Sequence, residues 1–131
     1  MTILYTNDVH TYIDNKSPKP TYAAIAALKK SIEDTGRDVL LVDAGDHIQG
    51  TAYGSMDDGA TIIELMNEAG YDLATPGNHE FDYGMARAKA VLQEADFPYV
   101  SCNWSICALA STFCPASSSS LWAAARSPLW A

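Results

Sequence analysis

The sequence predicts an α/β fold in which βα units build a mainly parallel sheet. Up to about Asn103, short apolar runs alternate with amphipathic stretches, which is typical of strands followed by helices. The run at 38–43 is continuously apolar in its centre, as expected for a parallel strand that is buried on both faces. Polar clusters follow three of the predicted strands, and in open α/β sheets ligands bind at that edge.

The element boundaries follow from capping and stop signals. The first strand is expected at 3–6, and Thr21 can cap a helix that Gly36 ends. The later elements are expected as a strand at 38–43, a helix from Asp57 or Asp58 to Gly70, a strand at 71–75, a helix from 83 or 84 to 95, and a short strand at 97–101.

The composition changes after Asn103. Every acidic residue lies before that point, and all three tryptophans lie after it. The 131 residues suffice for one compact domain at most. We therefore expect one partial domain at 1–103 and a foreign tail at 104–131 that is frameshifted, chimeric or disordered.

The charge and the composition of the chain argue against several classes of protein. A formal net charge of -8 repels nucleic acids and anionic membranes. No apolar run approaches the roughly 20 residues that span a bilayer, and no signal peptide is recognisable at Met1. The three cysteines are an odd number without zinc-finger spacing, which predicts neither a disulfide framework nor a zinc knuckle.

Two polar motifs follow the first two predicted strands. Asp8 and His10 are one residue apart, so both side chains can turn toward one point and offer an oxygen and a nitrogen ligand. A turn aspartate and a solvated histidine are the alternative for this pair. Gly45 lets the backbone turn so that Asp46 is presented at a strand tip, where a carboxylate can bridge two ions. For Asp46 alone, a capping role is the alternative.

The stretch at 77–82 is the most informative, because it places an amide, an imidazole and carboxylates directly after a strand. Asn78 can offer a neutral oxygen to a metal ion. His79 can act on the oxygens of a reacting phosphate if Asp82 accepts from its other ring nitrogen and fixes the tautomer. His47, which is adjacent to Asp46, is expected to support the site rather than to bind an ion.

In combination, Asp-x-His, Gly-Asp and Gly-Asn-His-Glu, each after a strand, resemble the motifs of the calcineurin-like metallophosphoesterase superfamily. The stretches at 5–10, 43–50 and 77–84 look like the bacterial 5′-nucleotidase, UDP-sugar hydrolase and 2′,3′-cyclic phosphodiesterase family. The resemblance covers roughly residues 2–103. It implies that 1–103 is an N-terminal fragment of the catalytic domain, a truncated part of a metallophosphoesterase αββα sandwich.

The resemblance also implies roles for six residues. They are Asp8 and His10 on one ion, Asp46 bridging both ions, Asn78 on the second ion, and His79 with Asp82 as the catalytic dyad. The implied cofactors are two divalent ions such as Zn or Mn, and the implied reaction is hydrolysis of nucleotide phosphate esters by metal-activated water. Members of the family are commonly exported or held at the cell surface.

The resemblance further requires downstream histidines and a separate nucleoside-binding domain, whereas the only histidines here are His10, His47 and His79. We therefore expect weak metal binding and little turnover. The alternatives are an inactive truncated module that self-associates through an exposed sheet edge, and an enzyme with the same metals that acts on another ester.

Overall fold

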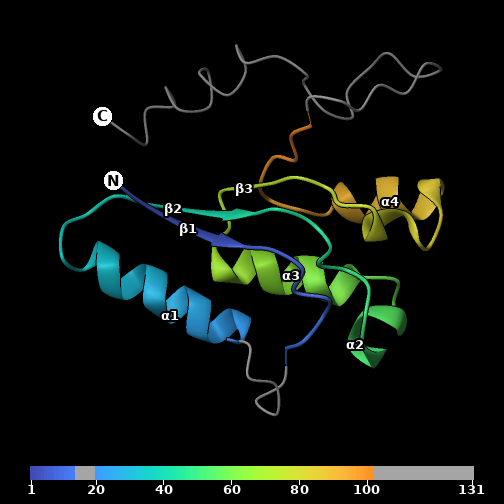
Figure 1. Cartoon of the computed structure of the whole chain (residues 1–131), viewed down its shortest axis with the longest axis horizontal. Coiled ribbons are helices and arrows are strands. Elements are labelled where there is room, and N and C mark those ends of the chain that lie inside the picture. Colours follow the sequence, from blue (N-terminus) through green and yellow to red (C-terminus); the bar gives the residue numbers. More distant parts are fainter. Residues whose placement is uncertain (14–19, 102–131) are drawn as a thin grey trace. The chain divides into compact units, whose positions relative to one another are not determined.

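A computed structural model describes residues 1–13 and 20–101 of the chain, and its cartoon is shown in Figure 1. It contains a parallel sheet with the strand order β1-β2-β3. The strands are β1 (Thr2–Thr6), β2 (Val39–Asp43) and β3 (Leu73–Ala74). The predicted α/β class with a parallel sheet is confirmed, whereas the predicted tail at 104–131 lies outside the described residues.

The helices connect the strands in the order that the sequence predicts. They are α1 (Tyr22–Glu33), α2 (Ala52–Ser55), α3 (Ala60–Ala69), α4 (Met85–Leu92) and a 3₁₀ turn, η1 (His79–Phe81). The predicted cap of the first helix is present, because the Thr21 hydroxyl accepts from the Ala24 N–H at 3.2 Å. The second long helix ends at Gly70, as predicted.

Several local features differ from the expectations, among them the strand expected at 71–75, which is reduced to Leu73–Ala74. The helix expected from Asp57 or Asp58 begins only at Ala60, because Gly59 has a left-handed conformation with φ of 93°. The short elements α2 and η1 were not predicted, since four and three residues are too few to show a helical period. The strand expected at 97–101 is reduced to one parallel bridge between Ala74 and Tyr99.

The core lies between one face of the sheet and the helices. Val39, Leu41 and Asp43 of β2 are buried, and α1 and α3 lie along one face of the sheet in Figure 1. The largest fully buried side chains that α3 contributes are Ile62, Ile63 and Met66. The alternate residues of β2 are only half-buried, so the expectation that this strand is buried on both faces was wrong for the described residues.

The other face of the sheet carries exposed apolar side chains. Ile3 and Tyr5 of β1 are 55% and 75% exposed. Among the described residues, no helix has the length and the apolar character that a membrane crossing needs.

The Tyr22 hydroxyl provides a test of the core. It is buried on α1, burial raises its pKa so that it stays neutral, and no partner for it exists among residues 1–13 and 20–101. We expect Tyr22→Phe to leave the free energy of unfolding unchanged or to raise it by ~1 kcal/mol, because an unpaired buried hydroxyl is unfavourable. Urea denaturation measures the change.

The matched control is Tyr71→Phe. The Tyr71 hydroxyl lies 2.9 Å from Thr6 Oγ1, and its ring packs edge-on against Tyr22. Its removal should lower the free energy of unfolding by ~1 kcal/mol, since a made hydrogen bond is lost. A larger loss for Tyr22→Phe than for Tyr71→Phe would contradict this description of the core.

Candidate metal centre

The site lies at the carboxyl edge of the parallel sheet, where three loops meet. Thr6 of β1 is opposite Asp43 of β2, and Asp43 is opposite Ala74 of β3, so the three strands end at the same level. The backbone joins the loops directly, because the Asp8 N–H donates to Gly45 O and the His10 N–H donates to Asp46 O. The clusters at 7–11, 44–51 and 75–82 therefore come together, as the sequence predicts.

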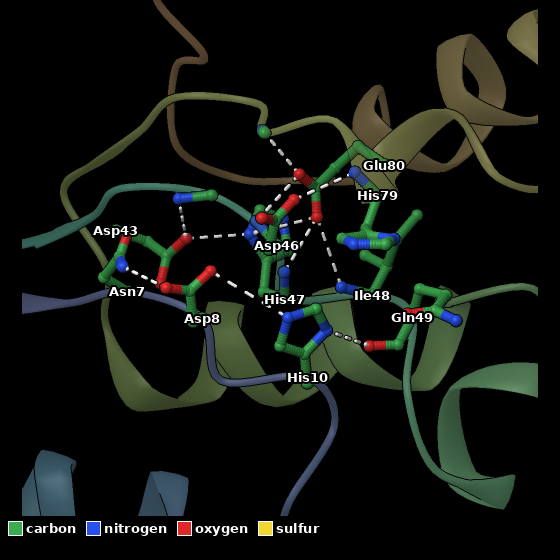
Figure 2. A network of polar contacts seen from close by, with 12 residues as sticks. Asn7, Asp8, His10, Asp43, Asp46, His47, Ile48, Gln49, His79 and Glu80 are labelled. Atoms are coloured by element: carbon green, nitrogen blue, oxygen red, sulfur yellow. Dashed lines mark hydrogen bonds and ion pairs between the residues drawn. The ribbon is translucent and has the colours of Figure 1, made fainter.

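Three of the predicted site residues form a group that could hold a cation. His10, Asp46 and His79 each offer one ligand atom, and these atoms all lie within 4.8 Å of one another. Asp8 is close to the same group, because its Oδ1 lies 3.9 Å from His10 Nε2 (Figure 2). Two ligands that are ~2.1 Å from one ion lie ~3–4 Å apart, so the residues present fit a divalent ion after small side-chain movements. The mixture of imidazole and carboxylate suits zinc or manganese.

The orientation of His10 is fixed from outside this group. Its Nδ1 lies 3.0 Å from the carbonyl oxygen of Gln49. A carbonyl only accepts, so Nδ1 carries a proton, and Nε2, on the side of Asp8, is the ring nitrogen that could bind an ion. This is how proteins usually orient an imidazole that binds a metal ion.

The backbone of the site is strained at three of the four predicted ligands. Asp8, His10 and Asp46 have φ values of 52°, 49° and 60°, in the left-handed region, and Thr11 joins them at 56°. Each such residue costs ~1–2 kcal/mol relative to ordinary conformations. Backbone outliers of this kind gather at functional sites, which supports a functional reading of this edge.

Two glycines allow the loops to approach closely. A Cβ on Gly45 would lie 2.5 Å from the Gly77 nitrogen. A Cβ on Gly77 would overlap the Asp46 carboxylate. The loop after β3 can therefore pass directly over Asp46 only because both positions lack a side chain.

Glu80 connects these loops, although the sequence alone assigned it no role. Its side chain is fully buried, and its Oε1 accepts the N–H groups of His47 at 2.8 Å and of Ile48 at 3.3 Å. Its Oε2 accepts the N–H of Asp46 at 2.9 Å and the N–H of Gly77 (Figure 2). Its place directly after His79 in the motif was the only sequence signal, since the four partners lie in backbone that the sequence does not reveal.

His47 belongs to a buried network below the site. Its Nδ1 lies 2.7 Å from Asp43 Oδ1 and its Nε2 lies 2.8 Å from the Tyr99 hydroxyl, so both ring nitrogens are engaged. Burial lowers the pKa of His47, but the hydrogen bond to Asp43 and the charges of Glu80, Asp43 and Asp46 outweigh it, and the net pKa is raised. This geometry agrees with the expectation that His47 supports the site without binding an ion.

His79 and Asp82 form the contact that the dyad hypothesis requires. His79 Nδ1 lies 2.7 Å from Asp82 Oδ2, and the two residues are three positions apart across η1. This hydrogen bond is the largest cause of the raised pKa of His79, and it outweighs the smaller effect of burial. The His79 ring faces the His10 ring edge-on, with 5.1 Å between the centroids.

Asn78 is exposed and is the N-cap residue of η1, but its side chain makes no capping hydrogen bond. It directly precedes His79, so the chain places it at the same edge of the sheet. The structure thus brings Asp8, His10, Asp46 and His79 together, with Asp82 behind His79 and Asn78 beside it.

The sequence is similar to known phosphoesterases. The profile of the family described as calcineurin-like phosphoesterase matches residues 1–121. The chain is 38% identical over 114 residues to a snake venom 5′-nucleotidase of Gloydius brevicauda. The matched region covers 79% of this chain and 19% of that relative. The chain is also 36% identical over 115 residues to a 5′-nucleotidase of Homo sapiens, and the matched region covers 79% of this chain and 20% of that relative. The chain therefore spans about one fifth of the length of these relatives.

Solved structures show the same similarity. A 5′-nucleotidase precursor from Thermus thermophilus has a TM-score of 0.70 and 30% identity, covering 77% of this chain and 22% of that one. The NAD nucleotidase of Haemophilus influenzae has a TM-score of 0.69 and 28% identity, covering 77% of this chain and 20% of that one.

Substitution of Gly77 tests the close approach of the loops. We expect Gly77→Ala to weaken Mn²⁺ binding by at least about tenfold, because the methyl group displaces the Asp46 carboxylate. The control is Gly36→Ala, where a Cβ meets nothing within 4 Å but φ is +79°. That control should lose ~1 kcal/mol of stability and keep its Mn²⁺ affinity. Equal affinities of both variants in isothermal titration would refute the role of Gly77.

Proposed function

The chain belongs to the calcineurin-like phosphoesterase family, and from this premise we propose that its parent protein is a 5′-nucleotidase-like hydrolase of nucleotide phosphate esters. The observation that carries the proposal is the convergence of His10, Asp46 and His79 at the sheet edge, within 4.8 Å of one another. The 5′-nucleotidase names of the relatives support the substrate class. The net charge of -8 fits a site for cations rather than a surface for nucleic acid.

The proposed metal-binding roles are those that the family resemblance implies. Asp8 and His10 would hold one ion, Asp46 would be shared by two ions, and Asn78 would hold the second ion. Asp46 suits a bridge because the His79 N–H donates to its Oδ1 at 2.9 Å, which fixes the carboxylate in orientation. Two divalent ions at such a site would lower the pKa of water and neutralise charge on a phosphate.

His79 serves as a proton donor to the oxygen that leaves the phosphorus. Asp82 holds its Nδ1–H, which fixes the ring and leaves Nε2 for the substrate. The raised pKa of His79 enlarges the protonated fraction near neutral pH, as a general acid requires. Asp82 orients this ring and stabilises its positive charge.

The chain itself should bind metal weakly and turn over little. Two ions with about four ligands each need more donors than Asp8, His10, Asp46 and Asn78 supply, even with a shared carboxylate. Hydrolysis of p-nitrophenyl phosphate with added Mn²⁺ should therefore stay near the rate of a His79→Ala variant. Robust turnover that depends on His79 would overturn this expectation for the chain.

A metal titration separates the roles of the two partly exposed imidazoles, His10 and His79. We expect His10→Ala to lower the Mn²⁺ affinity at least about tenfold, because a ligand is removed, and His79→Ala to change it less than about threefold. The electron paramagnetic resonance signal of free Mn²⁺ measures both affinities. An equal loss in the two variants would make His79 a ligand and exclude the dyad, and absence of Mn²⁺ binding by the wild-type chain would remove the metal centre.

A second candidate role is a non-catalytic module that pairs with another copy of the chain. The exposed Ile3 and Tyr5 on β1 favour it, since β1 is an edge strand of the described sheet.

The oligomeric state tests this second role. If it holds, size-exclusion chromatography with light scattering should show a dimer that Tyr5→Lys weakens at least about tenfold, because a charge replaces the apolar contact. The matched control is Leu28→Lys, since Leu28 is 51% exposed on α1. A monomer at every concentration would exclude the second role.

A further inference from the structure

Glu80 is a fully buried acidic group at the site, and nothing in the proposed chemistry uses it. Its exposed fraction is 0%, whereas His10, Asp46 and His79, which converge at the sheet edge, are partly exposed. A buried carboxylate is unfavourable unless hydrogen bonds stabilise its charge. Here the four N–H groups of Asp46, His47, Ile48 and Gly77 do so.

The donors come from two different loops. Three of them are consecutive residues after β2, and Gly77 lies in the loop after β3. Glu80 itself lies in η1, next to His79. Its carboxylate therefore closes the junction between the loop that carries Asp46 and the loop that carries His79.

Asp46 is held at both ends by this junction. Its backbone N–H donates to Glu80 Oε2 at 2.9 Å, and its side-chain Oδ1 accepts from the His79 N–H at 2.9 Å. The unusual φ of 60° at Asp46 can persist only where the surroundings determine it. The hydrogen bonds of Glu80 hold the Asp46 backbone in this conformation.

We propose that Glu80 is a positioning residue of the metal centre. It holds the two loops at the separation at which Asp46, His10 and His79 face one point before any ion binds. The inference rests on the proposed function, since it assigns the metal centre a residue that sets its geometry without touching an ion or a substrate.

Glu80→Gln is the sharpest variant, because it keeps the size of the side chain. One amide oxygen would remain, but the NH₂ group would face two N–H donors in either orientation, since each carboxylate oxygen accepts two. The two loops should move apart, and the candidate ligand atoms should no longer face one point. Loss of a group that orients metal ligands typically costs about 10–100-fold in metal affinity.

The first measurement needs no variant. In the metal-free 131-residue chain, the amides of Asp46, His47, Ile48 and Gly77 should be protected from hydrogen exchange, although all four lie outside helices and strands. Exchange of these amides at the rate of free peptides would overturn the inference and leave the metal proposal standing.

The second measurement is Mn²⁺ affinity at a temperature where every variant is folded by circular dichroism. Glu80→Gln should bind about 10–100-fold more weakly and lose protection at the four amides. Glu64→Gln, which removes an exposed charge on α3, should match the wild type. Met66→Ala, which opens a cavity at a fully buried site on α3, should lose stability and keep its affinity in the folded fraction.

The outcomes separate the two claims. An affinity of Glu80→Gln within about threefold of the wild type, or an equal loss in Met66→Ala, would overturn the positioning role. If Glu80→Gln does not fold, the exchange of the four amides in the wild type decides the inference. If the wild type binds no Mn²⁺, the proposed function fails, and amide exchange still decides whether Glu80 sets the loops.

Discussion

The geometry of the site depends on one buried carboxylate. Glu80 accepts four N–H groups from two loops that no helix or strand ladder satisfies. An unpaired buried N–H group costs about as much free energy as a lost hydrogen bond, and an unpaired buried charge costs more. The hydrogen bonds between the four N–H groups and the Glu80 carboxylate avoid both costs. A single side chain thereby makes the loop after β2 and the loop after β3 one unit.

This junction also explains how strained backbone persists at the proposed ligands Asp8, His10 and Asp46. Asp8, His10 and Asp46 all adopt left-handed conformations, which the local sequence would not choose. They are held because the loops bond to each other, as in Asp8 N–H to Gly45 O and His10 N–H to Asp46 O. The packed layer of α1 and α3 beneath the sheet fixes the strand ends from which the loops start.

The sequence predicted the fold class and the grouping of the ligands, for one shared reason. Motifs after parallel strands must meet at one sheet edge, so Asp46 and His79 could be placed together although 33 positions separate them. The sequence did not predict Glu80, α2 or η1. A glutamate in a motif does not reveal whether it is exposed or accepts four amides, and elements of three or four residues have no period to detect. Helix α3 begins later than predicted because Gly59 adopts a positive φ, and helix propensity alone does not specify that backbone angle.

Hydrogen-bond partners also separate three histidines that the sequence presents as similar. Both ring nitrogens of His47 are engaged by Asp43 and the Tyr99 hydroxyl, so it has no lone pair for an ion. His10 and His79 each have one ring nitrogen held, but by different partners. A neutral carbonyl holds His10 and adds no charge, which suits an imidazole that must bind metal unprotonated. A carboxylate holds His79, and this hydrogen bond is the largest cause of its raised pKa, which enlarges the fraction of His79 that can give a proton. Carbonyls and carboxylates both stand behind metal-bound imidazoles in proteins, so the ring partners orient His10 and His79 alike, and the charge of Asp82 is what distinguishes the residue proposed to give a proton.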